Sequence, residues 1–255
     1  MPKLAALILI LVFSLSGLGL IAYFVIWKLM IKPTYLKFSG ANYYYKKLSA
    51  KMKKSKKDIK AEFDTIIEQA KRCCAEEKTT VSILPYYEVD TRDALGFGLV
   101  PKLNTILYSS VWIELILTKS AKWQLAFAQS VGHELGHIDD IPKDAMFFFR
   151  KSADRRFFSW VREIRNDLYG VEFARKYYSC TKDEIQEAVR MKAKMYDKTT
   201  RKKNHHTHPT WCFRRYIIKK YAVLTEEAIL CIADKAGCTN KRYIDKLTKA
   251  VIEKT

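Results

Sequence analysis

The stretch KWQLAFAQSVGHELGHID, residues 122–139, carries the strongest structural signal in this 255-residue chain. Its apolar residues recur at helical spacing, as they do in a helix that turns one face to a protein core. They are Trp123, Leu125, Ala126, Ala128, Val131 and Leu135. The stretch therefore predicts a core helix, and the two histidines near its end are expected to lie on a buried element.

His133, Glu134 and His137 in this stretch form the pattern HExxH. Residues four apart lie on one face of a helix, so the two imidazoles can converge on one zinc ion. Glu134 lies one position round the helix, where it can reach a water molecule bound to that ion. The alternative is a helix with two exposed histidines, which the apolar residues around the motif disfavour. The pattern predicts Zn2+ as cofactor, His133 and His137 as metal ligands and Glu134 as a catalytic residue.

A catalytic zinc site needs a third protein ligand and an open position for water. Asp140 and Lys143 occupy the positions where the longer pattern HExxHxxGxxH has glycine and histidine, so the third ligand must come from elsewhere. Glu163 and Asp167 are the best candidates, because they are four apart in a helical pattern and flank its apolar stripe. That stripe consists of Trp160, Ile164, Leu168 and Val171.

Two half-buried carboxylates side by side repel each other unless a cation or a hydrogen-bond donor is near. Zinc on Glu163, with Asp167 orienting a ligand histidine through its ring N–H, removes this problem. Two alternatives remain open. Asp167 itself is the ligand in one, and in the other both acids face solvent and pair with Arg162 and Arg165.

With HExxH in GHELGH and ExxxD in EIRND, the sequence resembles the gluzincins, and among them the membrane metallopeptidases of the HtpX and CAAX prenyl endopeptidase type. His208, Pro209 and Arg214 form a further matching pattern, HPxxxxR. The resemblance covers about residues 80–220 and also includes a Gly-rich loop and a short strand before the motif helix. It implies that His208 lies near the zinc and stabilises an oxyanion, and that Arg214 is a structural ion-pair partner.

The sequence also departs from this family. Asp93 and Ala94 stand where the family commonly has Asn-Ala, and the chain has one predicted membrane helix where the family has more. These departures concern the substrate class more than the metal chemistry. His205 and His206, in a basic loop, are expected to be solvated.

Residues 4–30 are apolar almost throughout, with no charge before Lys28. A helix needs about 20 apolar residues to cross a bilayer, whereas the hydrophobic part of a cleavable signal usually has about 7–15. We therefore expect residues 1–31 to be a single-pass transmembrane anchor. The alternative is a signal peptide that is cut near Ser14, Ser16 or Gly17.

Basic residues are more numerous after this span than before it, and the positive-inside rule then places the catalytic domain in the cytoplasm. Only Lys3 precedes the span, whereas Lys28, Lys32, Lys37, Lys46 and Lys47 follow it. The cysteines agree with this orientation, because they contain no CxxC pair and no short secreted disulfide framework.

The formal net charge is +19, and seven of the twelve residues 46–57 are lysine. Because this cluster follows a membrane span, anionic lipid is the expected partner rather than nucleic acid. Simple solvation of a charged helix is the alternative. The cluster consists of Lys46, Lys47, Lys51, Lys53, Lys54, Lys56 and Lys57.

The expected fold is α+β and mainly helical, with an N-terminal transmembrane helix followed by a zincin-like metallopeptidase domain that has a small sheet. Residues 1–31 would be the anchor, residues 32–77 a basic juxtamembrane segment and residues 78–255 the metallopeptidase domain. Residues 41–76 read as a helical segment that packs on the domain or forms a stalk. Two or more strands are expected within residues 79–108, and helices at residues 111–117, 122–139, 155–178, 182–196 and in the last forty residues.

These features predict a zinc-dependent endopeptidase that acts on peptides or on unfolded or membrane-associated proteins. If the strand expected at residues 105–108 is the sheet edge beside the motif helix, it could pair with an extended substrate backbone. Two other functions remain open. One is an inactive membrane-tethered zincin-like scaffold, and the other is a binder of anionic lipid or nucleic acid built on the lysine cluster.

Overall fold

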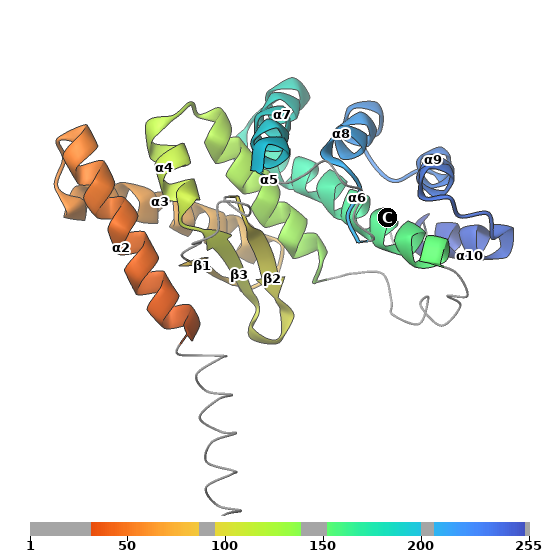
Figure 1. Ribbon diagram of the computed structural model, residues 1–255, viewed down its shortest axis with the longest axis horizontal. Helices are drawn as coiled ribbons and strands as arrows, with labels where there is room; N and C mark the ends of the chain where they lie inside the picture. The colour runs from red at the N-terminus through yellow and green to blue at the C-terminus, as the bar shows by residue number, and fades with distance from the viewer. Residues whose placement is uncertain (1–31, 87–94, 139–151, 200–206, 253–255) are drawn as a thin grey trace, which may run out of the picture.

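The computed structural model of the protein describes residues 32–86, 95–138, 152–199 and 207–252. In these ranges the chain is mainly helical with a small three-stranded sheet, which confirms the expected α+β class (Figure 1). The first half contains α2 (Lys32–Met52), α3 (Lys56–Glu76), β1 (Ser82–Tyr86), β2 (Phe97–Val100), the 3-10 helix η3 (Pro101–Leu103), β3 (Thr105–Ser109) and α4 (Val111–Thr118). The second half contains α5 (Lys122–Gly136), α6 (Ser152–Tyr178), α7 (Lys182–Thr199), α8 (Trp211–Lys220), α9 (Glu226–Ala236) and α10 (Lys241–Ile252).

Helices α5 and α6 pack closely against each other in the middle of the molecule (Figure 1). Two glycines permit this approach. A Cβ atom added to Gly170 of α6 would lie 2.3 Å from the Gln129 carbonyl oxygen, and one added to Gly132 of α5 would lie 2.8 Å from the Gly170 Cα atom. Because a side chain at either position would push the helices apart, these glycines set the separation of the two helices that carry the candidate site.

The sheet has the strand order β1-β3-β2. Strand β3 is central, with β1 parallel to it from Ser82 paired with Thr105, and β2 antiparallel to it from Phe97 paired with Tyr108. The condition for substrate pairing at residues 105–108 is therefore not met, because both sides of β3 are hydrogen-bonded within the sheet. Pro85 shows why β1 is an edge strand instead, since proline cannot donate a ladder hydrogen bond.

Residues 41–76 are helical, as expected, but they form parts of two helices, α2 and α3. The break lies at residues 53–55, where Lys53 has a positive φ of 53°. Ser55 then begins α3 as its N-cap, and its hydroxyl accepts a hydrogen bond from the Asp58 backbone N–H at 3.1 Å. The Ser55 cap and the repulsion between neighbouring lysines both favour a break here. The spacing of apolar residues along one helix face contains neither signal.

Two hydrophobic clusters form the core. The N-terminal cluster joins α2, α3, the sheet, α4 and α5, and it includes Leu48, Ile59, Phe63, Ile83, Ile106, Tyr108, Trp112 and Phe127. The C-terminal cluster joins α6 to the last three helices, and it includes Trp160, Ile164, Leu168, Val171, Ile217, Ile229, Ile232 and Leu247. The predicted apolar stripe of α6 is thus buried, and helices α2 and α3 pack on the rest of the molecule rather than forming a stalk.

Helices α8 and α9 each begin at a threonine N-cap, and α9 ends at a glycine. The hydroxyl of Thr210 accepts a hydrogen bond from the Phe213 backbone N–H, and that of Thr225 accepts one from the Ala228 backbone N–H. Gly237 ends α9 in the left-handed conformation. The start of α8 matters for the site, because this helix carries Arg214.

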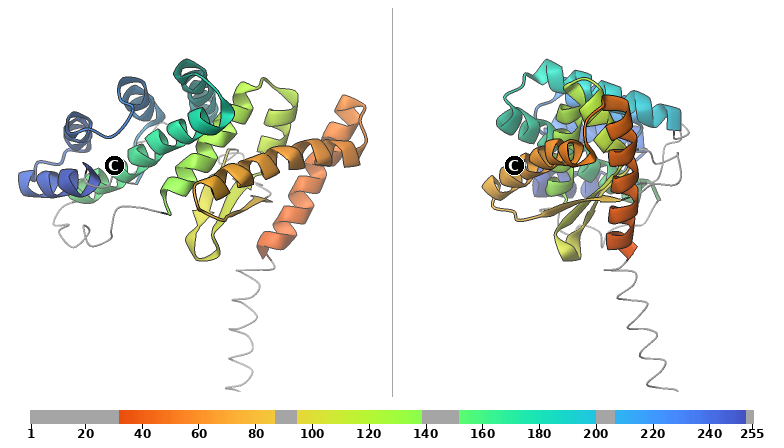
Figure 2. Two further views of the ribbon diagram at one scale, coloured as in Figure 1. Left: turned by 180° about the vertical axis from the view of Figure 1, so that it is seen from behind. Right: turned by 90° about the vertical axis from the view of Figure 1, so that its left-hand side faces the viewer.

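Figure 2 shows that the molecule is elongated, with α2 and α10 towards opposite ends. No helix in the described ranges has both the length and the apolar character that a bilayer span requires. The expected anchor at residues 4–30 lies outside those ranges.

Candidate metal centre

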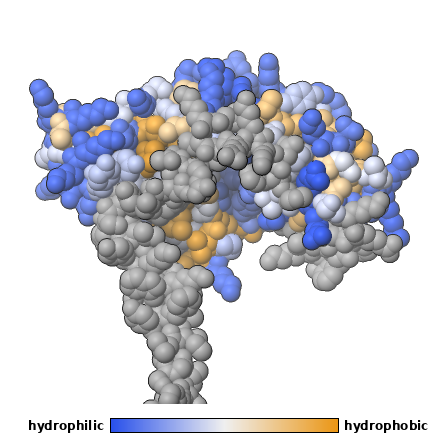
Figure 3. Space-filling view, in the orientation of Figure 1, coloured by the Kyte–Doolittle hydropathy of each residue, from blue (hydrophilic) through white to orange (hydrophobic). Residues whose placement is uncertain are grey.

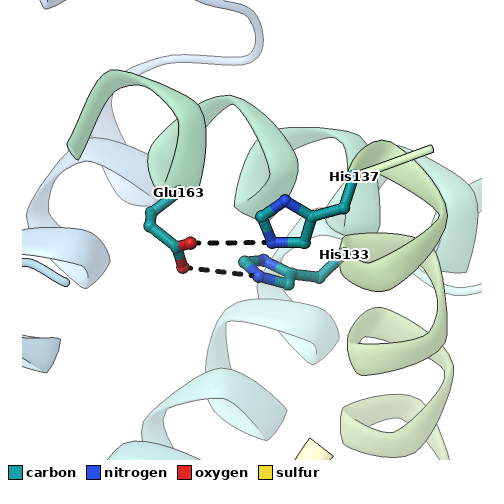
Figure 4. A group of neighbouring side chains, drawn as sticks. All are labelled: His133, His137 and Glu163. Atoms are coloured by element: carbon teal, nitrogen blue, oxygen red, sulfur yellow. Dashed lines mark ion pairs between the residues drawn. The ribbon is translucent and has the colours of Figure 1, made fainter. Parts of the chain in front are cut away.

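The last turn of α5 and the middle of α6 bring His133, His137 and Glu163 together (Figure 4). His133 lies in the last turn of α5, and His137 is the residue that caps the helix. Glu163 comes from α6 and points its carboxylate at both rings. His133 and Glu163 are buried and His137 is partly buried, so the group is largely shielded from bulk water.

The distances in this group suit a metal ion. The Nε2 atom of His133 lies 3.5 Å from Glu163 Oε2, and that of His137 lies 3.6 Å from Glu163 Oε1. An ordinary N–H···O hydrogen bond is shorter, at about 2.7–3.2 Å. In a tetrahedral site with bonds of about 2.0–2.1 Å, neighbouring ligand atoms lie about 3.4 Å apart. Because ligand atoms of all three residues lie within 4.8 Å of one another, the group can hold a metal ion.

The other ring nitrogen of each histidine contacts a side chain of α6. His133 Nδ1 lies 3.0 Å from Asp167 Oδ1, and His137 Nδ1 lies 2.7 Å from the Asn166 side-chain amide. Both contacts turn the Nε2 atoms towards Glu163. A neutral imidazole that binds a metal through Nε2 carries its proton on Nδ1, so Asn166 would have to present its amide oxygen to His137. That oxygen is buried and has no hydrogen-bond partner among the described residues.

Sequence reasoning missed Asn166. The available signal was its position three residues after Glu163 and directly before Asp167, which puts it near the same face of α6. Both acids turn inward, so the alternative in which Glu163 and Asp167 face solvent is wrong. Asp167 lies behind His133 and outside the group of ligand atoms.

Arg214 holds Asp167 in place from the opposite side. Its Nε and Nη2 atoms each donate to Asp167, at 2.6 Å to Oδ2 and 2.6 Å to Oδ1. The guanidinium also lies 4.0 Å from the centre of the Trp211 ring, and both it and Asp167 are buried. This bidentate pair compensates the charge of Asp167 and leaves Oδ1 also in contact with His133.

The charges of the group follow from these contacts. Burial disfavours a charge on His133, but the hydrogen bond with Asp167 and the nearby Glu163 outweigh burial and raise the pKa of His133 to about 9. Burial would raise the pKa of Glu163, but His133 and then Arg214 outweigh it and hold this pKa at about 2. The pKa of Asp167 is also lowered, because Arg214 and His133 outweigh burial. Two ionised acids, Glu163 and Asp167, therefore stabilise the protonated form of His133.

His208 lies beside the group. Its Nε2 atom is 3.4 Å from Glu163 Oε2, while 55% of its side-chain surface is exposed. It is not one of the three residues whose ligand atoms cluster together. One side of the His208 ring thus faces Glu163, and the other faces solvent.

Glu134 is buried next to His133 in the sequence and does not belong to the ligand group.

A second residue that sequence reasoning missed, Lys192 of α7, approaches this part of α5. Its Nζ atom donates to Ser130 Oγ at 3.0 Å and also to Gln129 Oε1, and it is buried. Burial lowers the pKa of Lys192 to about 7, although Asp167 and Glu134 oppose this shift. No spacing rule points to a lysine so far along the chain.

Several residues of the sequence argument lie outside the described ranges. They are Asp93, Ala94, Asp140, Lys143, His205 and His206.

Comparisons with protein-family models, curated proteins and solved structures find no match to this chain. What defines the site is therefore its own geometry, a largely buried group of two histidines and a glutamate that can bind a metal ion.

Proposed function

We propose that this protein is a membrane-anchored zinc-dependent endopeptidase. The observation that carries the proposal is the arrangement of His133, His137 and Glu163, with both Nε2 atoms facing one carboxylate at distances that suit zinc. Two imidazoles and one carboxylate are a common ligand set of catalytic zinc. Three protein ligands leave a fourth position for water, whereas structural zinc sites are usually closed by a fourth protein ligand.

Bound zinc would polarise the scissile carbonyl and lower the pKa of a coordinated water molecule. Glu134 would accept the proton of the attacking water and pass it to the leaving amine. Its burial near His133, outside the ligand group, supports this role. A structural zinc site would not need this acid.

Two further residues would assist the reaction. His208, with one side near Glu163 and the other exposed, would donate a hydrogen bond to the oxyanion. Arg214 would act through Asp167, because its bidentate hydrogen bonds hold the carboxylate that contacts His133. Asp167 and Asn166 would orient the two ligand rings.

The substrate would be a peptide or an unfolded or membrane-associated protein. Since β3 is central, the strand available for pairing on the side of α5 is β2. An extended peptide that adds to its outer side would run beside the motif helix. Residues 4–31 would anchor the chain in a membrane with the catalytic part in the cytoplasm, on the grounds of their apolar length and the lysines that follow.

The decisive test compares two substitutions of glutamate. Glu134→Gln keeps the size of the side chain but cannot accept a proton, so it should lower cleavage of casein by about 10²–10⁴-fold. Its zinc content, measured by mass spectrometry, and its thermal unfolding should equal those of wild type. Glu172→Gln is the matched control, because Glu172 is exposed on α6, and it should cleave casein like wild type.

A chelator should abolish cleavage by wild type, and added zinc should restore it. Equal cleavage by wild type and Glu134→Gln would contradict the proposed mechanism. A zinc-loaded wild type that cleaves no peptide would favour the scaffold, and a protein that binds no zinc would contradict the proposed zinc endopeptidase.

A further inference from the structure

The hairpin formed by β2 and β3 has an unusual composition for this chain. Charged residues make up 29% of the whole sequence, but residues 95–109 contain only one, Lys102, and no acid. The four residues of β2 are only partly buried, and residues 101–104 at the tip are exposed. Leu103 in this tip has 51% of its surface exposed. Figure 3 shows apolar surface over this part of the molecule.

The tip lies at the same end of the molecule as the start of α2. In Figures 1 and 2 the first turn of α2 and the turn between β2 and β3 both reach the lower edge of the described part. The apolar residues 4–30 come directly before α2 in the sequence. A bilayer spanned by those residues would therefore face the tip.

The lysine cluster lies elsewhere. Helix α2 has 21 residues, so its last turn is about 30 Å from its first. Most of the cluster lies at that distant end or in the turn to α3, and several of its lysines already have acidic partners. Lys47 lies 2.7 Å from Glu114, and Lys54 lies 2.8 Å from Glu62.

We propose that the hairpin tip, residues 101–104, together with Val100 at the end of β2, is a membrane-contact surface that rests on the lipid bilayer beside the N-terminal anchor. Leu103 would enter the boundary between headgroups and acyl chains, while Lys102 would reach lipid phosphates. Val100 and Pro101 add apolar surface, and the absence of acids avoids repulsion from anionic lipid. This inference rests on the membrane anchor of the proposed function, not on its zinc chemistry.

The test uses the full chain with Glu134→Gln, so that no substrate is cut. A photo-crosslinking phenylalanine analogue replaces Leu103, Lys57 of the lysine cluster or Leu230 in three separate proteins. Leu230 of α9 is the matched control, because 49% of its surface is exposed. Each protein is reconstituted into vesicles of phosphatidylcholine and phosphatidylserine that contain radiolabelled phosphatidylcholine, and casein is added outside.

We expect several-fold more labelled lipid on position 103 than on position 230 or 57. Equal labelling at 103 and 230 would overturn the proposal, and labelling at 57 without labelling at 103 would assign the contact to the lysine cluster instead. Crosslinking of position 103 to casein in place of lipid would identify a peptide-binding surface. A chain that does not float with the vesicles would overturn both the anchor and the hairpin contact, whereas flotation without lipid on 103 would overturn the contact alone.

Discussion

At the scale of single residues, the site depends on which nitrogen of each imidazole faces Glu163. Asp167 and Asn166 engage the two Nδ1 atoms, and this leaves both Nε2 atoms facing Glu163. Each histidine is thereby prepared to bind a metal through one defined nitrogen. Two consequences can be measured. Protons should compete with the metal for His133, and loss of Asp167 or Asn166 should weaken metal binding because the rings are no longer oriented.

Metal binding should depend on pH through His133. Its pKa in the metal-free protein is raised to about 9 by Asp167 and Glu163 against the effect of burial, so below this pH a metal must displace a proton from the ring. Zinc affinity should therefore rise about tenfold per pH unit up to about pH 9, with release of one proton from this residue. Glu163, with a pKa of about 2, is already ionised and adds nothing to this slope.

Calorimetric titration with zinc in buffers of different ionisation enthalpy measures both quantities. Asp167→Asn is the informative comparison, because it removes the charge that contributes most to raising this pKa. The pH at which affinity levels off should then fall towards 6.5. A levelling-off pH that is the same in both proteins would contradict the role of His133.

The roles of the α6 residues can be separated by zinc affinity. Glu163→Ala removes a ligand and should empty the site. Asp167→Ala and Asn166→Ala remove groups that orient His133 and His137, so each should weaken zinc binding by about 10–100-fold. Glu172→Ala, an exposed change on the same helix, should have no effect. If Asp167→Ala empties the site while Glu163→Ala leaves it filled, the two roles are reversed.

At the scale of elements, the close contact of α5 and α6 determines how far the histidines lie from Glu163. A Cβ on Gly132 would lie 2.7 Å from Phe173 Cβ, and backbone on the opposite helix is equally near. Neither neighbour can move without shifting α6. The contact between the helices therefore helps to position the site, because Gly132 directly precedes His133.

Gly132→Ala should therefore lower both the free energy of unfolding and the affinity for zinc. Overpacking of this kind typically costs about 1–3 kcal/mol, which outweighs the gain of up to about 1 kcal/mol from the better helix propensity of alanine. Gly98→Ala is the control, because no atom lies within 4 Å of the added Cβ. Denaturant unfolding and zinc titration measure the two effects. A Gly132→Ala protein as stable as wild type would show that the helices are not held at this distance.

At the scale of the whole molecule, the candidate site lies where the two hydrophobic clusters meet. Helix α5 supplies mainly the N-terminal cluster, and α6 supplies mainly the C-terminal one. Phe63 of α3 is part of the support of α5, with its ring centre 6.5 Å from that of Phe127 and 6.0 Å from that of Tyr108. Glu77 accepts hydrogen bonds from Lys176 and Tyr177 of α6.

A chain that begins at residue 78 should consequently lose stability, because it lacks the apolar residues of α2 and α3 that cover the sheet and α5. A chain that begins at residue 32 should fold and bind zinc, since it retains both clusters. Thermal unfolding and size-exclusion chromatography of the two chains test this. If the chain from residue 78 unfolds at the same temperature as the longer one, residues 32–77 contribute little to the core.

Local patterns in the sequence were sufficient for most of the helices and for most of the candidate site, although they did not reveal the break between α2 and α3. The apolar spacing of residues 122–139 and of the α6 stripe predicts two buried helices, and both are present. Helical geometry alone aligns His133 with His137, and Glu163 with Asp167, because residues four apart share a face. Glu163 was chosen as a ligand because a catalytic zinc site needs a third protein ligand beside His133 and His137.

Only the tertiary structure decided which side chains from distant segments meet. The partnership of Asn166 with His137, the approach of Lys192 to Gln129 and Ser130, and the central place of β3 each join segments far apart in the sequence. Short-range periodicity carries no information about such contacts, since they depend on how whole helices pack. The sequence by itself determined the ligand types and their helical spacing, whereas the packing of α5 on α6 decided the distances that make them one site.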